Sequence, residues 1–524
     1  MKDTLKLSYF QLTIIYTVIV FAVSAEFLSE YTLHFELFAL IIAILGISAL
    51  KDERLKVNER FIYFLFLTAL FSCFIFRMIP YMNNEVPLGY DPGIYKYIFE
   101  RFEKALPDIP EEELDLWIRT GFPSGLPTLI DEFYLLGFTT DEILKPVFII
   151  FSSLLIFPIY LVAKKYFGKE AGIVASLLYA FSYTQLQTFW FMYYKNVVGM
   201  ALLLFATYFM DHDDRRYTPL MILFATMLGF THRPTFLILA MIWVSYILIN
   251  LKKTNILKEN AIRILATGIL LFTLYLPRLN ETILKPLEGV FGSILEPGMI
   301  GPGTFFSLSK YQLTSLSYLP FALLGFLYLA IRKRFNPLLF WFLINGFIVY
   351  FKIMFYNRFI IQLDIIAIIL ASAGLLYGII IPLQKKRIGL LITLLLLVSS
   401  GIITYNSAID MKPLLTGTQL ASIQKIPELT EEDAYVMAIT SYYSPWILGY
   451  SGRKTIAPGL FDYDKWSIKE WRKFWYADSI EEIKDLLEMY DKPLYIFIGK
   501  HPSNKLVNLE KFNCSSFQQV LNDE

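Results

Sequence analysis

The chain has 524 residues, of which 56% are hydrophobic, 17% aromatic and only 18% charged. Soluble globular proteins are seldom so apolar, so we expect most of the chain to lie in a membrane. Lys and Arg number 47 against 46 Asp and Glu, and the resulting net charge of +1 gives no basic field for nucleic acid. The two cysteines, Cys73 and Cys514, are too far apart in predicted location to suggest a disulfide.

Long apolar segments recur from the N-terminus to about residue 405. A helix needs roughly 20 apolar residues to cross a bilayer core, because its backbone polar groups must be paired internally. Met1 to Lys6 carries two lysines before the first apolar run and fits a membrane anchor better than a cleaved signal peptide. About thirteen spans are predicted on this criterion, near residues 8–25, 34–50, 61–79, 143–163, 170–188, 196–210, 218–231, 235–250, 261–278, 315–331, 337–353, 359–382 and 388–405.

Basic residues are concentrated in alternate short loops, as expected if those loops stay on the cytoplasmic side. They are Lys51 to Arg60, Lys164 to Lys169, Arg215 and Arg216, Lys252 to Lys258, Arg332 to Arg334, and Lys385 to Arg387. This pattern predicts a multi-pass protein of the cell membrane with a cytoplasmic N-terminus. Residues 80–142, residues 279–314 and everything after residue 405 are then extracytoplasmic.

The two predicted outer loops differ in character. In the first, Thr128 to Gly137 predicts a short apolar helix, too short to span and suited to the membrane interface. The second is rich in Gly and Pro around Glu296 to Gly303, which fits either a lid over a site or a simple connector.

Residues 406–524 predict a small α/β domain outside the membrane, large enough to hold its own core. Ala434 to Thr440 and Leu494 to Ile498 have the composition of strands. Ser479 to Tyr490 has the apolar spacing of an amphipathic helix. We therefore expect two N-terminal helices in residues 1–60, a membrane core in 61–405 and an extracytoplasmic domain in 406–524.

One carboxylate stands out in the first outer loop. Asp91 lies in the sequence Gly-Tyr-Asp-Pro-Gly just beyond the third predicted span, and the flanking Gly89, Pro92 and Gly93 favour a turn. A carboxylate held over the membrane surface can accept a proton from an attacking hydroxyl, or ligate a divalent ion such as Mg²⁺ or Mn²⁺. The alternative is a structural Asp-Pro-Gly turn with no further role.

Cations also occur at the ends of spans on the predicted outer side, where the charge bias does not expect them. They come from three separate places in the chain, and they are Lys195, His232 with Arg233, and Lys352 with Arg358. Any one of them is explained by contact with lipid headgroups. Together they favour a shared anionic ligand, most naturally a phosphate, which guanidinium and ammonium groups bind well.

The tail domain combines aromatic side chains with a cation. Trp446 ends the sequence Tyr-Tyr-Ser-Pro-Trp, and Arg453 follows Gly-Tyr-Ser-Gly. Aromatic faces stack on sugar rings, and Arg can bind hydroxyls or phosphate. An aromatic core patch of a small domain explains the same residues equally well.

Several of these segments, taken in order, resemble the GT-C superfamily of membrane glycosyltransferases, which use polyprenyl-phosphate-linked sugars. The resemblance rests on Gly89 to Tyr95, Phe122 to Leu126, Thr231 to Arg233 and Tyr356 to Phe359, and it is closest to archaeal members. It implies a GT-C-like helical membrane fold, an outward-facing site and inversion at the anomeric carbon. One departure is that the loop follows the third span where many members have it after the first, so the shared core would begin near residue 61.

Carried over to this chain, the resemblance makes Asp91 the catalytic base and Arg358 a ligand of the lipid phosphate, with His232 and Lys352 assisting. Further expected substrate-binding residues are Tyr90, Tyr95, Lys195, Arg233, Trp446 and Arg453. Oligosaccharyltransferase catalytic subunits are a neighbouring branch, but the Trp-Trp-Asp of their external domain is replaced by Tyr442 to Trp446. This difference argues against peptide glycosylation.

The sequence therefore predicts an inverting membrane glycosyltransferase. Its partners would be a polyprenyl-phosphate sugar donor, membrane lipids, and a glycan, lipid or protein acceptor with a hydroxyl group. A transporter or flippase of a lipid-linked or anionic substrate is the main alternative, and it requires charged residues and broken helices near mid-membrane. A membrane anchor that presents residues 406–524 to a partner is the third.

Overall fold

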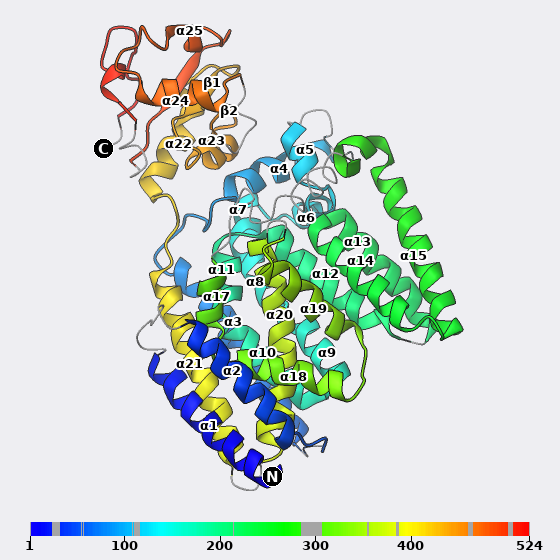
Figure 1. Ribbon diagram of the computed structural model, residues 1–524. Helices are drawn as coiled ribbons and strands as arrows, with labels where there is room; N and C mark the ends of the chain where they lie inside the picture. Colours follow the sequence, from blue (N-terminus) through cyan, green and yellow to red (C-terminus); the bar gives the residue numbers. More distant parts are fainter. Residues whose placement is uncertain are drawn as a thin grey trace.

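The structure is a computed structural model that describes residues 2–23, 32–53, 55, 57–106, 108, 110, 116–212, 214–284, 307–353, 356–383, 387–458, 465–500 and 507–522. It consists of a large helical bundle with a small domain at one end (Figure 1). The N-terminus lies at the opposite end of the bundle. We refer to the end that carries α4, α6 and the small domain as the domain end.

Helices make up nearly the whole membrane part. The N-terminal half contains α1 (Lys2–Val23), α2 (Thr32–Gly46), α3 (Glu59–Met78), α4 (Pro92–Ala105), α5 (Leu116–Gly121), α6 (Gly125–Leu135), α7 (Thr140–Glu142), α8 (Phe148–Leu154), α9 (Ile156–Phe167), α10 (Lys169–Ala180), α11 (Tyr183–Trp190) and α12 (Tyr194–Met210). The C-terminal half contains α13 (Thr218–Thr231), α14 (Arg233–Ile249), α15 (Thr254–Tyr275), α17 (Leu308–Thr314), α18 (Leu319–Ile331), α19 (Pro337–Tyr350), α20 (Tyr356–Leu375) and α21 (Ile388–Asp410). Short 3₁₀ or π turns extend several of them, at Ile47–Ala49, Ile79–Tyr81, Ile143–Val147, Arg215–Tyr217, Leu276–Arg278, Asn280–Leu284 and Leu376–Ile380.

Several helices are long and apolar enough to cross a membrane, as the sequence predicted. Within the described residues there are five: Asp3–Ala22, Glu59–Tyr81, Thr140–Phe167, Tyr356–Ile380 and Ile388–Asp410. A sixth is obtained if α17 and α18, which meet at an angle of 89°, count as one broken span. Four shorter apolar helices accompany them. The helical membrane class is confirmed, whereas the number thirteen stays a prediction.

Tyr356–Ile380 forms the centre of the bundle, because its whole apolar window is buried by other helices. Gly325 and Gly374 permit the close approach of α18 and α20, since a Cβ at either position would lie 2.0 Å from a backbone oxygen of the other helix. A central helix of this kind fixes the position of its own first turn, which lies at the domain end (Figure 1).

Two helix breaks are closed by side chains from distant elements. The Tyr16 hydroxyl donates to the Leu316 carbonyl, in the bend between α17 and α18, at 2.7 Å. The Thr404 hydroxyl donates to the Phe181 carbonyl, between α10 and α11, at 2.6 Å. Because water is absent from a bilayer core, backbone carbonyls released by a break need such donors.

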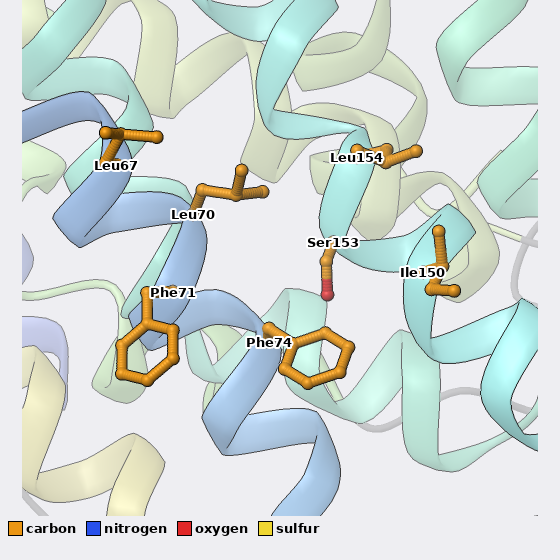
Figure 2. A pocket seen from close by; sticks show the side chains of 7 residues that line it. All are labelled: Leu67, Leu70, Phe71, Phe74, Ile150, Ser153 and Leu154. Carbon is orange, nitrogen blue, oxygen red and sulfur yellow. The ribbon is translucent and has the colours of Figure 1, made fainter. Parts of the chain in front are cut away.

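A groove of about 600 Å³ opens on the side of the bundle between α3 and α8 (Figure 2). Its lining is almost wholly apolar, and it consists of Leu67, Leu70, Phe71, Phe74, Ile150, Ser153 and Leu154. Leu67 and Phe71 are 61% and 65% exposed. Exposed apolar side chains of this kind are expected on a face that lipid chains cover.

The C-terminal domain contains a three-stranded parallel sheet in the order β2-β1-β3, with β1 at Tyr435–Ala438, β2 at Lys454–Ile456 and β3 at Leu494–Phe497. Its helices are α22 (Gly417–Leu429), α23 (Ser444–Ser451), α24 (Ile468–Tyr476) and α25 (Lys484–Leu487), with a 3₁₀ turn at Glu510–Phe512. Met437 and Ile456 of the sheet pack with Trp466, Trp471 and Phe474 in a core of its own.

This domain confirms a small C-terminal α/β unit and both predicted strands. The predicted helix over Ser479 to Tyr490 is wrong in extent, because only Lys484–Leu487 is helical. A turn in which the Ile483 amide donates to the Ile480 carbonyl precedes it. Ile483 and Leu486 are buried as the apolar spacing indicated, so the pattern identified the inward face but not the short length.

Candidate functional site

Asp91 is held at the start of α4 by a compact turn. Asn84 closes the preceding loop, since its side chain donates to the Val86 carbonyl at 2.7 Å and accepts from the Val86 amide at 3.0 Å. Pro92 then begins α4, and Asp91 occupies the N-cap position without making a side-chain capping bond. The carboxylate therefore makes no hydrogen bond to the amides of its own helix and is available for other partners.

Two cations interact electrostatically with this carboxylate. Burial raises the pKa of Asp91 above its ordinary range, and the positive charges of Arg358 and Lys195 act in the opposite direction. Arg358 comes from the first turn of α20 and Lys195 from the first turn of α12. Residues separated by more than 260 positions in the sequence thus meet at the domain end.

Lys195 is positioned by the end of α11 and by α4. Met192 adopts a left-handed conformation, φ +56°, which ends α11 and turns the chain into α12. The Lys195 amide donates to the Tyr95 hydroxyl at 3.3 Å, and its ammonium donates to the Gly121 carbonyl at 3.2 Å. The ammonium also lies 3.8 Å from the centre of the Phe122 ring. Phe122, in one of the segments on which the family resemblance rests, therefore contacts the cation directly.

A narrow crevice, too small to hold a water molecule, lies beside Lys195. It is lined by Tyr95, Ile98, Phe99, Phe122, Pro123, Leu126, Pro127, Lys195 and Thr231. These residues come from α4, α6, α12, α13 and the segment just before α6. The crevice is mostly apolar and has one cationic side chain in its wall.

His232 and Arg233 occupy the turn between α13 and α14, as predicted. His232 is buried, and its Nδ1 hydrogen-bonds with the Thr235 hydroxyl at 2.6 Å. The Gln362 side-chain amide donates to the same hydroxyl at 2.9 Å, which connects this turn to α20. Burial and the charges of Lys195, Arg358 and Arg233 lower the pKa of His232, so this imidazole is neutral near pH 7.

We define the Asp91 cluster as Asp91, Lys195, His232, Arg233 and Arg358. Each member interacts electrostatically with at least one other member. The Arg358 guanidinium also lies over the Tyr193 ring, 5.7 Å from its centre. Such a cluster can accept a proton at Asp91 and bind an anion with the remaining groups.

Of the other predicted site residues, two aromatic ones lie beside the cluster. Tyr95 is buried and accepts the Lys195 amide. Tyr90 precedes Asp91, and its hydroxyl donates to the Ser441 carbonyl of the C-terminal domain. The structure thus assigns Tyr90 a contact between domains.

Three predicted site residues are not brought into the cluster. Lys352 is exposed after the end of α19. Trp446 is fully buried, so its faces cannot stack on a sugar in this state. Arg453 donates to the Pro427 and Thr430 carbonyls at 2.9 and 3.0 Å, where it caps the end of α22. A sugar-binding role for these last two residues stays a prediction. The predicted lid at 296–303 lies outside the described residues.

Three residues near the cluster were not singled out in the sequence. Tyr193 carries the Arg358 guanidinium on its ring, whereas Thr235 and Gln362 hold His232. Each lies within or near a predicted apolar span. A single polar or aromatic residue at such a position cannot be told from an ordinary core residue by its sequence pattern.

The described part of the cluster does not fit a divalent cation. No group of three or more His, Cys, Asp and Glu side chains that could hold a metal is found among the described residues. The single carboxylate of the Asp91 cluster is accompanied by three cationic residues, which repel a metal ion.

A second buried carboxylate, Asp364, lies in the middle of α20 and is fully buried. It accepts hydrogen bonds from Ser182 and Gln185, both at 2.8 Å, and from the Tyr318 hydroxyl. Ser182 begins α11, and Tyr318 lies in the bend before α18. Asp364 therefore joins the two broken regions of the bundle to its central helix.

The part of the chain that supplies Lys195 and His232 matches a known enzyme family. A family model described as dolichyl-phosphate-mannose-protein mannosyltransferase matches residues 127–279, which include Lys195, His232 and Arg233. No curated protein sequence matches the chain. The predicted resemblance to membrane glycosyltransferases is confirmed by this family match together with the solved structures of similar fold.

Among solved structures, the chain is similar to the oligosaccharyltransferase of Archaeoglobus fulgidus tethered to an acceptor peptide. The TM-score is 0.61 at 15% identity, over 82% of this chain and 68% of that one. The same archaeal enzyme, AglB, in complex with an inhibitory peptide and a dolichol-phosphate gives 0.59 at 16% identity, over 81% and 68%. ArnT from Cupriavidus metallidurans bound to undecaprenyl phosphate gives 0.55 at 10% identity, over 84% and 90%. At these identities the similarity establishes a shared fold.

Proposed function

We propose that this protein transfers a sugar from a polyprenyl-phosphate donor to a hydroxyl acceptor on the extracytoplasmic side of the cell membrane, with inversion at the anomeric carbon. The proposal rests above all on the convergence of Asp91 with Lys195 and Arg358 at the domain end. A general base and an anion site are the two things that this reaction requires.

The reaction is a single displacement. The acceptor oxygen forms a bond to the anomeric carbon, and the bond between that carbon and the donor phosphate oxygen breaks. The acceptor proton passes to the Asp91 carboxylate, and the bonding electrons leave with the polyprenyl monophosphate. Because attack and departure occur on opposite faces of the sugar, the configuration inverts.

The cations act on the leaving group. The phosphate gains negative charge as the sugar departs, and Lys195 and Arg358 stabilise that charge in a partly dehydrated site. Neutral His232 adds a hydrogen-bonding group beside them, and Arg233 adds a further positive charge. The polyprenyl phosphates bound in two solved relatives of the same fold support this class of donor.

The acceptor is a glycan, a lipid or a protein hydroxyl. An acceptor peptide is bound by the Archaeoglobus fulgidus enzyme, but this chain has Tyr-Tyr-Ser-Pro-Trp at residues 442–446 in the place of the Trp-Trp-Asp segment expected for peptide acceptors. We therefore favour a hydroxyl acceptor over a peptide amide. The extracytoplasmic side follows from the distribution of Lys and Arg among the loops.

Two features favour the alternative of a transporter, namely the 89° break between α17 and α18 and the intramembrane carboxylate Asp364. The hydrogen bonds of Asp364 argue against a mobile role, because Ser182, Gln185 and Tyr318 satisfy it within the packed bundle. Transport would also require a path through the bundle centre, which the fully buried span Tyr356–Ile380 occupies.

The decisive experiment measures transfer in native membranes supplied with radiolabelled dolichyl-phosphate-linked mannose, glucose or galactose. Label should move from the lipid donor to an acceptor fraction with the wild-type chain. With Asp91→Asn, which keeps the side-chain volume but cannot take a proton at pH 7, the rate should fall by about 100-fold or more to a small residual rate. Wild-type transfer by Asp91→Asn would disprove the mechanism. Passage of intact donor across sealed vesicles without transfer would establish the alternative.

A further inference from the structure

Asp91 lies between two glycines whose backbones press on other parts of the protein. Gly89, at φ +85°, contacts the end of α11, where an added Cβ would lie 2.7 Å from the Phe191 carbonyl carbon. Gly93 contacts α23 of the C-terminal domain, where an added Cβ would lie 1.8 Å from the Pro445 carbonyl oxygen. The turn that carries Asp91 is therefore held on one side by the membrane bundle and on the other by the C-terminal domain.

The contact between α4 and α23 is reciprocal. A Cβ added to Gly449 would lie 2.1 Å from the Gly93 carbonyl oxygen and 2.7 Å from the Gly93 carbonyl carbon. Real Cβ atoms essentially never approach another heavy atom closer than 3.0 Å. Because the atoms met on both sides belong to the backbone, no side-chain rotation can relieve a substitution at either glycine. The two helices cross at a distance that only a pair of glycines permits.

Side chains on both sides of this crossing fix its register. The Tyr90 hydroxyl donates to the Ser441 carbonyl, and the Lys96 ammonium lies 5.0 Å from the centre of the Tyr450 ring. Trp446 is fully buried at the crossing, and its ring stacks on Tyr450 with centres 5.8 Å apart. Residues before and after Asp91 are thus both attached to the C-terminal domain.

We infer that the C-terminal domain positions the catalytic carboxylate, with Gly449 and Gly93 as the positioning residues that set the distance of Asp91 from the cations. This inference rests on the proposed function, in which Asp91 is the base. The glycines do not touch the substrate; they act through Asp91, which is two residues from Gly93 in the first turn of α4.

The expected effect follows from the contact distance. Gly449→Ala must separate α23 from α4 by about 1 Å to reach an allowed contact, and a displacement of that size at a reacting group costs about 100-fold in rate. In the proposed function the donor phosphate is held by residues of α12 and α20, whereas Gly449 packs against Gly93 of α4. The loss should therefore appear in kcat, with the KM for the donor within about twofold of wild type.

The experiment compares Gly449→Ala with Gly417→Ala in the full-length protein, using whichever of the three radiolabelled dolichyl-phosphate sugars supports transfer. Gly417 lies in the same domain, and a Cβ there meets no atom within 4 Å, so this control should keep the wild-type kcat. We expect Gly449→Ala to lose about 100-fold in kcat. A wild-type kcat for Gly449→Ala would overturn the inference.

A double variant tests whether Gly449 acts through Asp91. In the Asp91→Asn background, Gly449→Ala should cause no further loss, because the group that it misplaces is already inactive. An equal further loss would show that Gly449 acts independently and would refute the positioning role. If Asp91→Asn itself keeps the wild-type rate, the proposed function fails, which is distinguishable from failure of the inference alone.

Tyr90→Phe provides a second route in case the alanine variant does not fold. It removes the hydroxyl bonded to Ser441 without adding volume. We expect a smaller loss of kcat, about two- to tenfold, which is again absent in the Asp91→Asn background. A wild-type kcat for a folded Tyr90→Phe protein, alongside an unfolded Gly449→Ala protein, would count against the inference.

Discussion

Replacing Arg358 with glutamine should displace the pH dependence of transfer. Asp91 acts as a base only when ionised, and Arg358 is the stronger of the two cations that favour its ionised form. An opposite charge within several ångströms lowers a carboxyl pKa by about one to three pH units. Its loss therefore raises the pKa of Asp91, and the acid limb of the kcat/KM profile should move to higher pH.

The size of the displacement should follow the order of the charges. Arg358→Gln should move the acid limb further than Lys195→Gln, because the Arg358 charge acts more strongly on Asp91. Both variants should also lose about 100-fold or more in plateau rate, since each removes a group that stabilises the departing phosphate. The two effects are separable. The plateau rate measures how well the departing phosphate is stabilised, and the position of the acid limb measures the pKa of the Asp91 carboxyl.

The assay is the radiolabelled transfer measured from pH 4 to 9 at low donor concentration. Arg358→Lys keeps the charge and should leave the limb near its wild-type position while lowering the plateau. Lys352→Gln removes an exposed cation outside the Asp91 cluster and should change neither. An acid limb that stays in place or moves to lower pH in Arg358→Gln would refute the electrostatic coupling.

Three further predictions concern the metal, the interfacial helix and the core. Transfer should be unchanged by excess EDTA, because the three cations around Asp91 repel a divalent ion; a loss restored by Mg²⁺ or Mn²⁺ would contradict this. Burial raises the pKa of Asp131 in α6 to about 6, and the charges of Glu103 and Glu132 act in the same direction. The folded protein therefore holds a proton on Asp131 more tightly than the unfolded chain does. This stabilises the fold fully below the ordinary pKa of an Asp, and the stabilisation is lost as the pH rises through 6. The melting temperature of the wild type should therefore fall between pH 4 and 6, and that of Asp131→Asn should not. Asp364→Leu should destabilise the bundle by about 3 kcal/mol or more, since it leaves three buried donors unmatched; thermal unfolding in detergent measures it.

The sequence predicted site residues best where a charged residue stands at the edge of an apolar span without an evident structural reason. Asp91 was predicted because a carboxylate between Gly and Pro at the edge of a span has few structural reasons to be there. Lys195 and Arg358 were predicted because they break the distribution of positive charge expected for loops. The structure brings these three residues together.

Other features of the structure could not be predicted, for a common reason. Trp446 and Arg453 have the composition of a sugar-binding surface, but composition does not reveal whether a side chain turns inward, and in this structure Trp446 is buried and Arg453 caps a helix. The contact of Gly93 with Gly449 joins residues more than 350 positions apart, so no local pattern indicates it. The helix breaks near Phe181 and Leu316 were also missed, because hydropathy is insensitive to a carbonyl that a distant hydroxyl satisfies.

The bond from Tyr16 to Leu316 gives the first helix a role in the architecture of the enzyme core. A shortened chain beginning near residue 61 would keep every member of the Asp91 cluster, yet it would leave the Leu316 oxygen facing hydrocarbon without a donor, at a cost of several kcal/mol. The bend before α18 would then have to straighten or recruit water. Tyr318 and Asp364 adjoin that bend and would shift with it. The N-terminal helices therefore stabilise the bend and the part of the bundle that surrounds Asp364.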